Sequence, residues 1–211
     1  MDEPLASLDA ARKAEIMPFL LRLDAALHLP ILYVTHALEE IGRLADHIVL
    51  LRAGRALAAG PLAEIAVRAD LPLAQRDDAA AVLDATVLAQ DAARRLSRLS
   101  AGGAEFWVPM LDAAPGAATR IRIPAREVIL AGAAPEAISV HNVLPGTVRA
   151  IVADAPRHAA LVEVGLPAGA LLARVTADAI DRLRLTPGAP VLALVKSVAI
   201  EVLGRAGPAS P

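Results

Sequence analysis

The sequence of 211 residues predicts an α/β segment followed by an all-β module made of two similar halves. In the first 67 residues, helical spacing of apolar side chains alternates with short apolar runs. From residue 82 onward, short alternating runs are separated by Gly and Pro turns, which is typical of β structure. The longest stretch without Asp, Glu, Lys or Arg is 25–38, which is too short for a bilayer span of about 20 apolar residues.

The balance of charges and the absence of cysteine exclude several classes of protein. A net charge of −2 argues against a nucleic-acid binder, because such proteins concentrate Lys and Arg on one face. Without cysteine the chain has no disulfide framework, no thiolate nucleophile and no zinc–cysteine site. We therefore expect a protein of a reducing compartment with no nucleic-acid partner.

Residues 8–67 predict alternating helices and strands. Asp9 supplies an N-cap carboxylate for an amphipathic helix that contains Pro18. The run 31–35 is rich in β-branched residues and does not alternate, which predicts a strand buried on both faces. The other elements expected here are a helix at 37–44, a strand at 47–51 and a return strand that ends at 60–61.

The remaining sequence predicts a linker and two β halves. Residues 68–81 mix Pro, Asp, Arg and Ala without a period and predict the linker. Five short strands in about 60 residues suit a small barrel of the oligonucleotide/oligosaccharide-binding type. The expected boundaries are 82–132 for the first half, 137–203 for the second and 204–211 for a disordered tail.

The two β halves have the character of a degenerate repeat. The matched segments are Thr86-Val87 with Thr147-Val148, Pro115-Gly116 with Pro187-Gly188, and 125–129 with 195–200 after a shift of one residue. Phe106 and Trp107 lie in an alternating run of the first half, and we predict that both belong to the core.

An acidic pair stands near the start of the sequence. Asp2 and Glu3 are followed at fixed spacing by Asp9, and then by a helix and an apolar run that ends at Thr35-His36. Paired carboxylates suit nucleotide hydrolysis, because one can hold Mg²⁺, commonly through water, while its neighbour polarises the attacking water. This combination resembles the ATP-binding subunits of ABC transporters.

The resemblance implies a role for each of these residues. Asp2, at the end of the Walker B strand, would serve Mg²⁺, and Glu3 would be the catalytic base. Asp9 of the D-loop would communicate across the nucleotide-sandwich dimer, and the switch histidine His36 would contact the γ-phosphate of ATP. Residues 1–67 would then be the C-terminal part of an ATPase domain. Since the sequence contains neither G-x-x-x-x-G-K-[ST] nor Leu-Ser-Gly-Gly-Gln, we expect no ATP turnover from this chain alone.

A second resemblance lies in the second β half. Segments 139–148 and 195–198 resemble the Mop domain, a molybdate-binding barrel of the wider TOBE group, and 82–132 resembles a degenerate TOBE half. A tetrahedral oxyanion needs hydroxyl and amide donors with limited positive charge. The residues expected to bind molybdate are Ser139, His141, Thr176, Lys196 and Ser197.

Two positions depart from the pattern of the Mop family. His141 stands where the family usually has arginine, and Ala179 replaces a common hydroxyl. Loss of a fixed guanidinium weakens dianion binding unless His141 is protonated. We therefore expect molybdate affinity to rise as the pH falls through the titration of His141.

Together, the resemblances imply the ATP-binding subunit of a molybdate ABC importer with a regulatory oxyanion-binding domain. Such a subunit would form a homodimer under a permease, at the cytoplasmic face of the bacterial inner membrane, and use ATP and Mg²⁺. Two alternatives remain: a non-enzymatic protein that stores or senses molybdate or tungstate, and an ABC subunit for sulfate, iron or sugar. The donor set favours molybdate or tungstate as the ligand.

Overall fold

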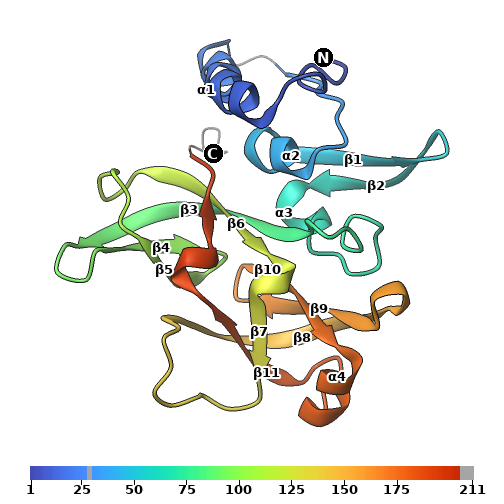
Figure 1. Cartoon of the computed structure of the whole chain (residues 1–211), viewed down its shortest axis with the longest axis vertical. Helices are drawn as coiled ribbons and strands as arrows, with labels where there is room; N and C mark the ends of the chain where they lie inside the picture. The colour runs from blue at the N-terminus through green and yellow to red at the C-terminus, as the bar shows by residue number, and fades with distance from the viewer. Residues whose placement is uncertain (28–29, 205–211) are drawn as a thin grey trace.

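The computed structural model describes residues 1–27 and 30–204 and places a small α/β part above a larger β module (Figure 1). The α/β part comprises residues 1–67 and the β module residues 80–203. The α/β elements are α1 (Ala10–Leu27), α2 (Leu38–Leu44), β1 (His47–Arg52), β2 (Arg55–Pro61) and α3 (Leu62–Ile65). The predicted N-cap of α1 is confirmed, since Asp9 Oδ1 accepts a hydrogen bond of 2.9 Å from the Arg12 backbone N–H. Apart from Gly204, the predicted tail at 204–211 lies outside the described residues.

The prediction that 31–35 is a strand buried on both faces is wrong. Only Val34 forms a bridge there, parallel to Asp2, and Leu32 is 80% exposed. The run pairs on one side with residues 1–3 and has no second partner strand among the described residues, so its apolar side chains stay accessible. The helix α1 is likewise less buried than its apolar spacing predicts, since Phe19 is 63% exposed.

The β module is built of short strands, as the alternating runs from residue 82 onward predict. Its first half contains β3 (Ala80–Asp91), β4 (Leu96–Ala101), β5 (Ala104–Pro109), β6 (Ala118–Pro124) and β7 (Val128–Ala131). Its second half contains β8 (Asn142–Asp154), β9 (Ala159–Leu166), β10 (Gly169–Thr176), α4 (Ala177–Leu183), β11 (Pro190–Val195) and β12 (Glu201–Val202). Short 3-10 turns lie at η1 (Ala125–Glu127), η2 (Ala155–Arg157) and η3 (Ser197–Ala199).

The two halves exchange their last strands. The first sheet has the order β12-β6-β3-β4-β5, and the second has the order β10-β9-β8-β11-β7. Thus β7 leaves the first half to pair with β11, and β12 leaves the second half to pair with β6. Neither half completes its own sheet, and the two are joined into one body.

The repeat is confirmed in three dimensions by two of its three predicted matches, whereas the third is displaced, because Ala125 begins η1 and Ser197, rather than Val195 or Lys196, begins η3. The register of β3 shifts after Val87 and that of β8 after Val148. At each shift the backbone N–H of the valine donates a hydrogen bond of 2.9 Å to the carbonyl of the residue that follows a turn glycine. This residue is Ala117 in the first half and Ala189 in the second. The matched Gly116 and Gly188 both adopt positive φ, near +90°, which an L side chain rarely tolerates.

The core draws on both sheets, as the exchange requires. Phe106 of β5 and Leu172 of β10 are both fully buried in one continuous apolar cluster. The prediction for Trp107 is wrong, because alternation along β5 turns Phe106 inward and Trp107 outward. The Trp107 ring is instead contacted by the Arg94 guanidinium, 4.7 Å from the ring centroid.

The predicted linker at 68–81 is a packed series of turns, whose last two residues already belong to β3. Leu71 and Ala74 are buried. Arg174 of β10 donates to the carbonyls of Ala74 and Arg76 at 3.0 and 2.7 Å. These contacts fix the connection between the α/β part and the β module.

Arg120 of β6 joins the two parts directly. Its buried guanidinium donates to Asp84 of β3 at 2.8 Å and, across the junction, to Asp46 at 2.9 Å and the Ala45 carbonyl at 2.8 Å. Burial lowers the pKa of Arg120, but the two carboxylates outweigh burial and leave that pKa raised. The junction is thus held by a cation that stays charged.

None of the described helices is both long and apolar enough to cross a membrane.

Candidate functional site

The acidic pair and the switch histidine meet at one edge of the α/β part. Residues 1–3 run parallel to 32–34, with Glu3 N donating to the Val34 carbonyl at 2.8 Å. Because the carboxyl ends of parallel segments meet at the same edge, Glu3 and His36 come together. Glu3 Oε1 lies 2.8 Å from His36 Nδ1, and both side chains are accessible to solvent.

A buried carboxylate holds this edge in place. Glu40 of α2 is only 3% exposed and accepts hydrogen bonds from Lys13 Nζ, Tyr33 Oη and Thr35 Oγ1 at 2.8, 3.1 and 2.7 Å. Burial raises the pKa of Glu40, but the three donors together outweigh burial and lower that pKa below its usual range. Burial, and then the neighbouring Glu40 charge, raise the pKa of Tyr33 to about 12.

This network is not among the features that the sequence predicts. A glutamate in the first turn of a predicted helix looks like a solvated charge that favours the helix dipole. The signal that could have found it is the threonine five residues earlier, directly before His36, whose hydroxyl can reach the helix. Through Thr35, Glu40 fixes the segment that carries His36.

The other predicted nucleotide-site residues are engaged locally. Asp2 contributes the backbone bridge to Val34, while Asp9 caps α1. Within residues 1–27 and 30–204, no group of three His, Cys, Asp or Glu side chains could hold a metal ion. Proteins commonly hold Mg²⁺ by one or two carboxylates together with substrate phosphates and waters. Asp2, whose exposed carboxylate lies next to Glu3 in the chain, fits the protein's share of such a site.

The second half brings together three of the five predicted oxyanion ligands, two of them in direct contact. His141 Nδ1 lies 3.3 Å from Ser197 Oγ, which joins the start of β8 to the first residue of η3. Ser197 is 7% exposed, whereas the adjacent Lys196 and the His141 ring are accessible. A hydroxyl, an imidazole and an ammonium thus lie on two neighbouring segments.

The other two predicted ligands, Ser139 and Thr176, are not hydrogen-bonded to this pair in the described part of the chain. Thr176 caps α4, with its Oγ1 accepting 3.2 Å from the Ala179 N–H. That bond leaves the threonine hydroxyl hydrogen available to a ligand. Ser139 is exposed in the bend before β8.

The same positions in the first half lack donors. Val87 is equivalent to Val148, and Gly116 is equivalent to Gly188. Counting residues from these two pairs, along β3 and β8 and along β6 and β11, gives the first-half counterpart of each ligand. His141, Lys196 and Ser197 correspond to Ala80, Pro124 and Ala125.

A pocket of about 390 Å³ lies beside these first-half positions. Three carboxylates and two guanidinium groups contribute to it, and Arg122 already donates to both carboxylate oxygens of Glu201 at 2.9 and 2.8 Å. Its charges therefore favour packing over capture of an anion. The lining residues are Glu39, Asp78, Arg122, Pro124, Arg126 and Glu201.

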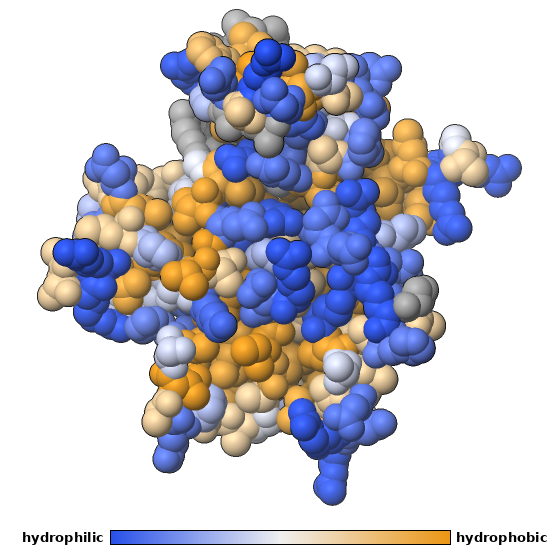
Figure 2. Space-filling view, viewed as in Figure 1, coloured by the Kyte–Doolittle hydropathy of each residue, from blue (hydrophilic) through white to orange (hydrophobic). Residues whose placement is uncertain are grey.

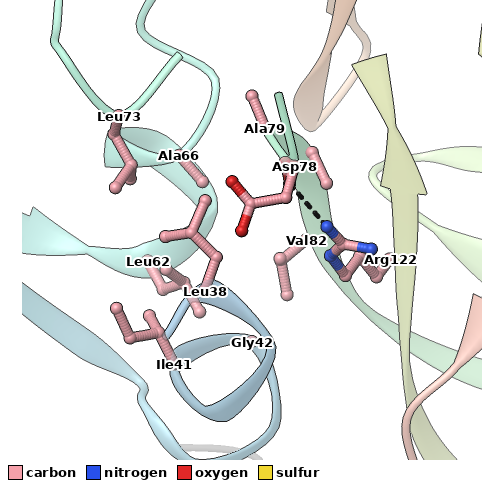
Figure 3. A pocket seen from close by; sticks show the side chains of 11 residues that line it. Leu38, Ile41, Gly42, Leu62, Ala66, Leu73, Asp78, Ala79, Val82 and Arg122 are labelled. Carbon is pink, nitrogen blue, oxygen red and sulfur yellow. Dashed lines mark hydrogen bonds between the residues drawn. The ribbon is translucent and has the colours of Figure 1, made fainter. Parts of the chain in front are cut away.

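A second, smaller pocket lies between α2, α3 and β3 (Figure 3). Leu38, Ile41 and Leu62 supply one apolar wall, and Arg122 Nη2 donates to the Asp78 carbonyl at 2.5 Å on the other side. Its volume of about 20 Å³ leaves room for little more than one water. It is a packing defect at the junction of the two parts.

Known proteins are similar to this chain in both the α/β part and the β module. The TOBE domain model matches residues 138–202. The molybdenum import ATP-binding protein ModC of Granulibacter bethesdensis is 50% identical over 214 residues, which cover 97% of this chain and 57% of that protein. ModC of Albidiferax ferrireducens is 46% identical and ModC of Aromatoleum aromaticum 47%, each over 95% of this chain and 54% and 53% of the relative.

The chain is a member of the ATP-binding subunit family of molybdate ABC transporters. It spans about half the length of the curated relatives that it matches. The family resemblance stated from the Asp2-Glu3 pair and the Mop-like segments is therefore confirmed.

A solved structure matches the β module. The molybdate-bound crystal structure of the cytoplasmic molybdate-binding protein ModG has a TM-score of 0.51 and 26% identity, and the match covers 59% of this chain and 95% of that one. The predicted fold class, an α/β segment followed by a β module of two half-repeats, is thus confirmed.

The Glu40 network yields a stability prediction. Glu40→Gln removes a buried carboxylate from three donors, and we expect a loss of about 1.5–3 kcal/mol in the free energy of unfolding near neutral pH. Because the pKa of Glu40 is lowered in the folded chain, its contribution exists above the ordinary value of 4.5 and is lost as the pH falls through the folded pKa. Urea denaturation at several pH values measures both effects.

The matched control is Glu39→Gln on the same helix, whose carboxylate is largely exposed and pairs with Arg43 at 3.4 Å. This variant should stay close to the wild type at every pH. Equal stability of Glu40→Gln and Glu39→Gln would show that the network does not hold the His36 segment.

Proposed function

We propose that the chain belongs to the ATP-binding subunit of a molybdate importer, and that its second β half binds the molybdate oxyanion. The relatives named as molybdenum import proteins and the molybdate-bound ModG structure support this ligand. The relatives align with the α/β part as well as with the β module, which favours a transporter subunit over a storage protein.

The observation that carries the oxyanion proposal is the asymmetry of the repeat. Two halves with the same strand order differ at the loop positions: one has Ala80, Pro124 and Ala125, and the other has hydroxyl, imidazole and ammonium groups. An oxyanion is recognised by fixed donors and positive charge. Only the second half supplies them among these positions.

Protonation of His141 would tune the site. When Nδ1 is unprotonated, the Ser197 hydroxyl can donate to it across the 3.3 Å contact. When the imidazole is protonated, Nδ1 donates instead, the Ser197 hydrogen is freed for the anion, and a positive charge is added. Both effects favour molybdate at lower pH.

A second copy of the chain is the partner proposed for this face. Exposed apolar side chains stand next to the candidate ligands in the sequence, with Ile138 before Ser139 and Val198, 80% exposed, after Ser197. Figure 2 shows an apolar area where β7 and β11 lie in Figure 1, and Ile129 of β7 is half exposed. Burial of such side chains against another copy would favour a homodimer.

The α/β part is proposed to act on ATP within the complete subunit. Asp2 would hold Mg²⁺ through water, and the ion would neutralise phosphate charge. Glu3 would polarise the attacking water, and the 2.8 Å contact between Glu3 and His36 supports a role for the histidine in the same step. Asp9 would face the second copy. The whole subunit would work beneath an inner-membrane permease, at the cytoplasmic face.

The oxyanion proposal is tested by molybdate titration of Lys196→Ala. Loss of a charge-assisted hydrogen bond of about 1.5–3 kcal/mol should weaken binding about ten- to a hundredfold. Isothermal calorimetry of the chain measures the dissociation constant. The control is Arg126→Ala, which removes a positive charge at the first-half counterpart of Val198 and should leave the affinity unchanged. If both variants weakened molybdate binding equally, the effect of Lys196→Ala would be due to the change in net charge and not to a hydrogen bond at the site.

The role of His141 predicts a pH dependence. The affinity of the wild type for molybdate should rise as the pH is lowered, because a protonated imidazole at position 141 adds a positive charge beside the anion. His141→Gln should flatten that rise, while His158→Gln, which alters an exposed histidine of the same half, should retain it. A rise that persists in His141→Gln would assign the titration to another group.

A further inference from the structure

Asn142 is a buried polar residue with no assigned task. It is 1% exposed and lies in β8 directly after His141. In the β ladder it is opposite Val195, the residue directly before Lys196. Asn142 therefore stands beneath the two segments that carry the candidate oxyanion ligands.

The side-chain amide of Asn142 is fully hydrogen-bonded to three backbone groups. Its Oδ1 accepts from the Trp107 N–H at 2.6 Å, and its Nδ2 donates to the carbonyls of Trp107 and Val195, both at 3.0 Å. Only an amide offers one acceptor and two donors in this arrangement. One side chain thus ties β8 and β11 of the second half to β5 of the first.

This clamp belongs only to the half with the candidate ligands. Asn142 lies six residues before the register shift of β8, and Ala81 lies six residues before that of β3, so the two positions correspond. Ala81 pairs with Ile123 just as Asn142 pairs with Val195. A methyl group makes none of these bonds. The first half therefore pairs the same strands without a buried amide. The amide is present only in the half that carries the candidate oxyanion donors.

We propose that Asn142 is the positioning residue of the oxyanion site, fixing His141 against Lys196 and Ser197, and that it links site occupancy to Trp107. The proposal rests on the function proposed above. The turn η3, which carries Ser197, packs against β5, so the three hydrogen bonds of Asn142 and this packing hold the site from one side. Trp107 is the single tryptophan of the chain, and its ring is contacted by Arg94. A shift of β5 would change its fluorescence.

The test compares Asn142→Ala with Ser97→Ala in the full chain. Ser97 is also fully buried and makes two hydrogen bonds, to Gln90 and from the Leu111 N–H, but it lies in β4 of the first half. Both variants should unfold at lower temperature than the wild type. Only Asn142→Ala should raise the molybdate dissociation constant, by about tenfold or more, and abolish the Trp107 fluorescence change on titration with molybdate.

Amide hydrogen exchange without ligand separates this proposal from the function on which it rests. Asn142→Ala should accelerate exchange at Trp107 and at 196–199, and Ser97→Ala should leave 196–199 unchanged. A wild-type chain that binds no molybdate would refute the proposed function, and exchange would still decide whether Asn142 fixes these segments. Unchanged exchange at 196–199, or an unchanged dissociation constant in a binding chain, would overturn the positioning role.

Discussion

The exchange of β7 and β12 between the two sheets is the constraint on which the rest of the β module depends. Each five-stranded sheet takes its fifth strand from the other half, so neither half can form its whole sheet alone. The exchange also sets the place of the turns before the crossing strands. The turn η3 lies between β11 of one sheet and β12 of the other, and it carries Ser197 at the boundary.

Buried polar contacts concentrate where parts of the chain meet. Arg120 joins the first sheet to the α/β part, and Arg122 clamps the exchanged strand β12 through Glu201. Asn142 joins the second half to β5 of the first. Apolar packing alone is tolerant of small shifts, whereas a hydrogen-bonded buried group requires one arrangement, because leaving it unpaired is costly. These three residues therefore specify how the parts sit together.

The local elements could be predicted from the sequence, but their partners could not. Alternation located the strands, and the matched Thr-Val and Pro-Gly pairs located the repeat, since both are local patterns. The exchange leaves no such mark, because β7 alternates in the same way whichever sheet it joins. The role of Asn142 could not be predicted, since nothing local distinguishes a buried amide from a turn amide. The strand at 31–35 failed for a related reason: apolar content shows what a segment can bury, and pairing decides what it does bury.

The divergence of the two halves follows from what each one faces. In the first half, Asp78, Pro124 and Arg126 lie beside α2 of the α/β part, and Arg122 is occupied by Glu201 and the Asp78 carbonyl. A loop in that position is constrained to pack, and alanine and proline suffice. In the second half, His141 and Lys196 are accessible to solvent. There donors can stay unpaired at the surface at little cost, because water satisfies them until an anion replaces it. One strand order thus gives a packing surface in one half and a surface suited to binding in the other.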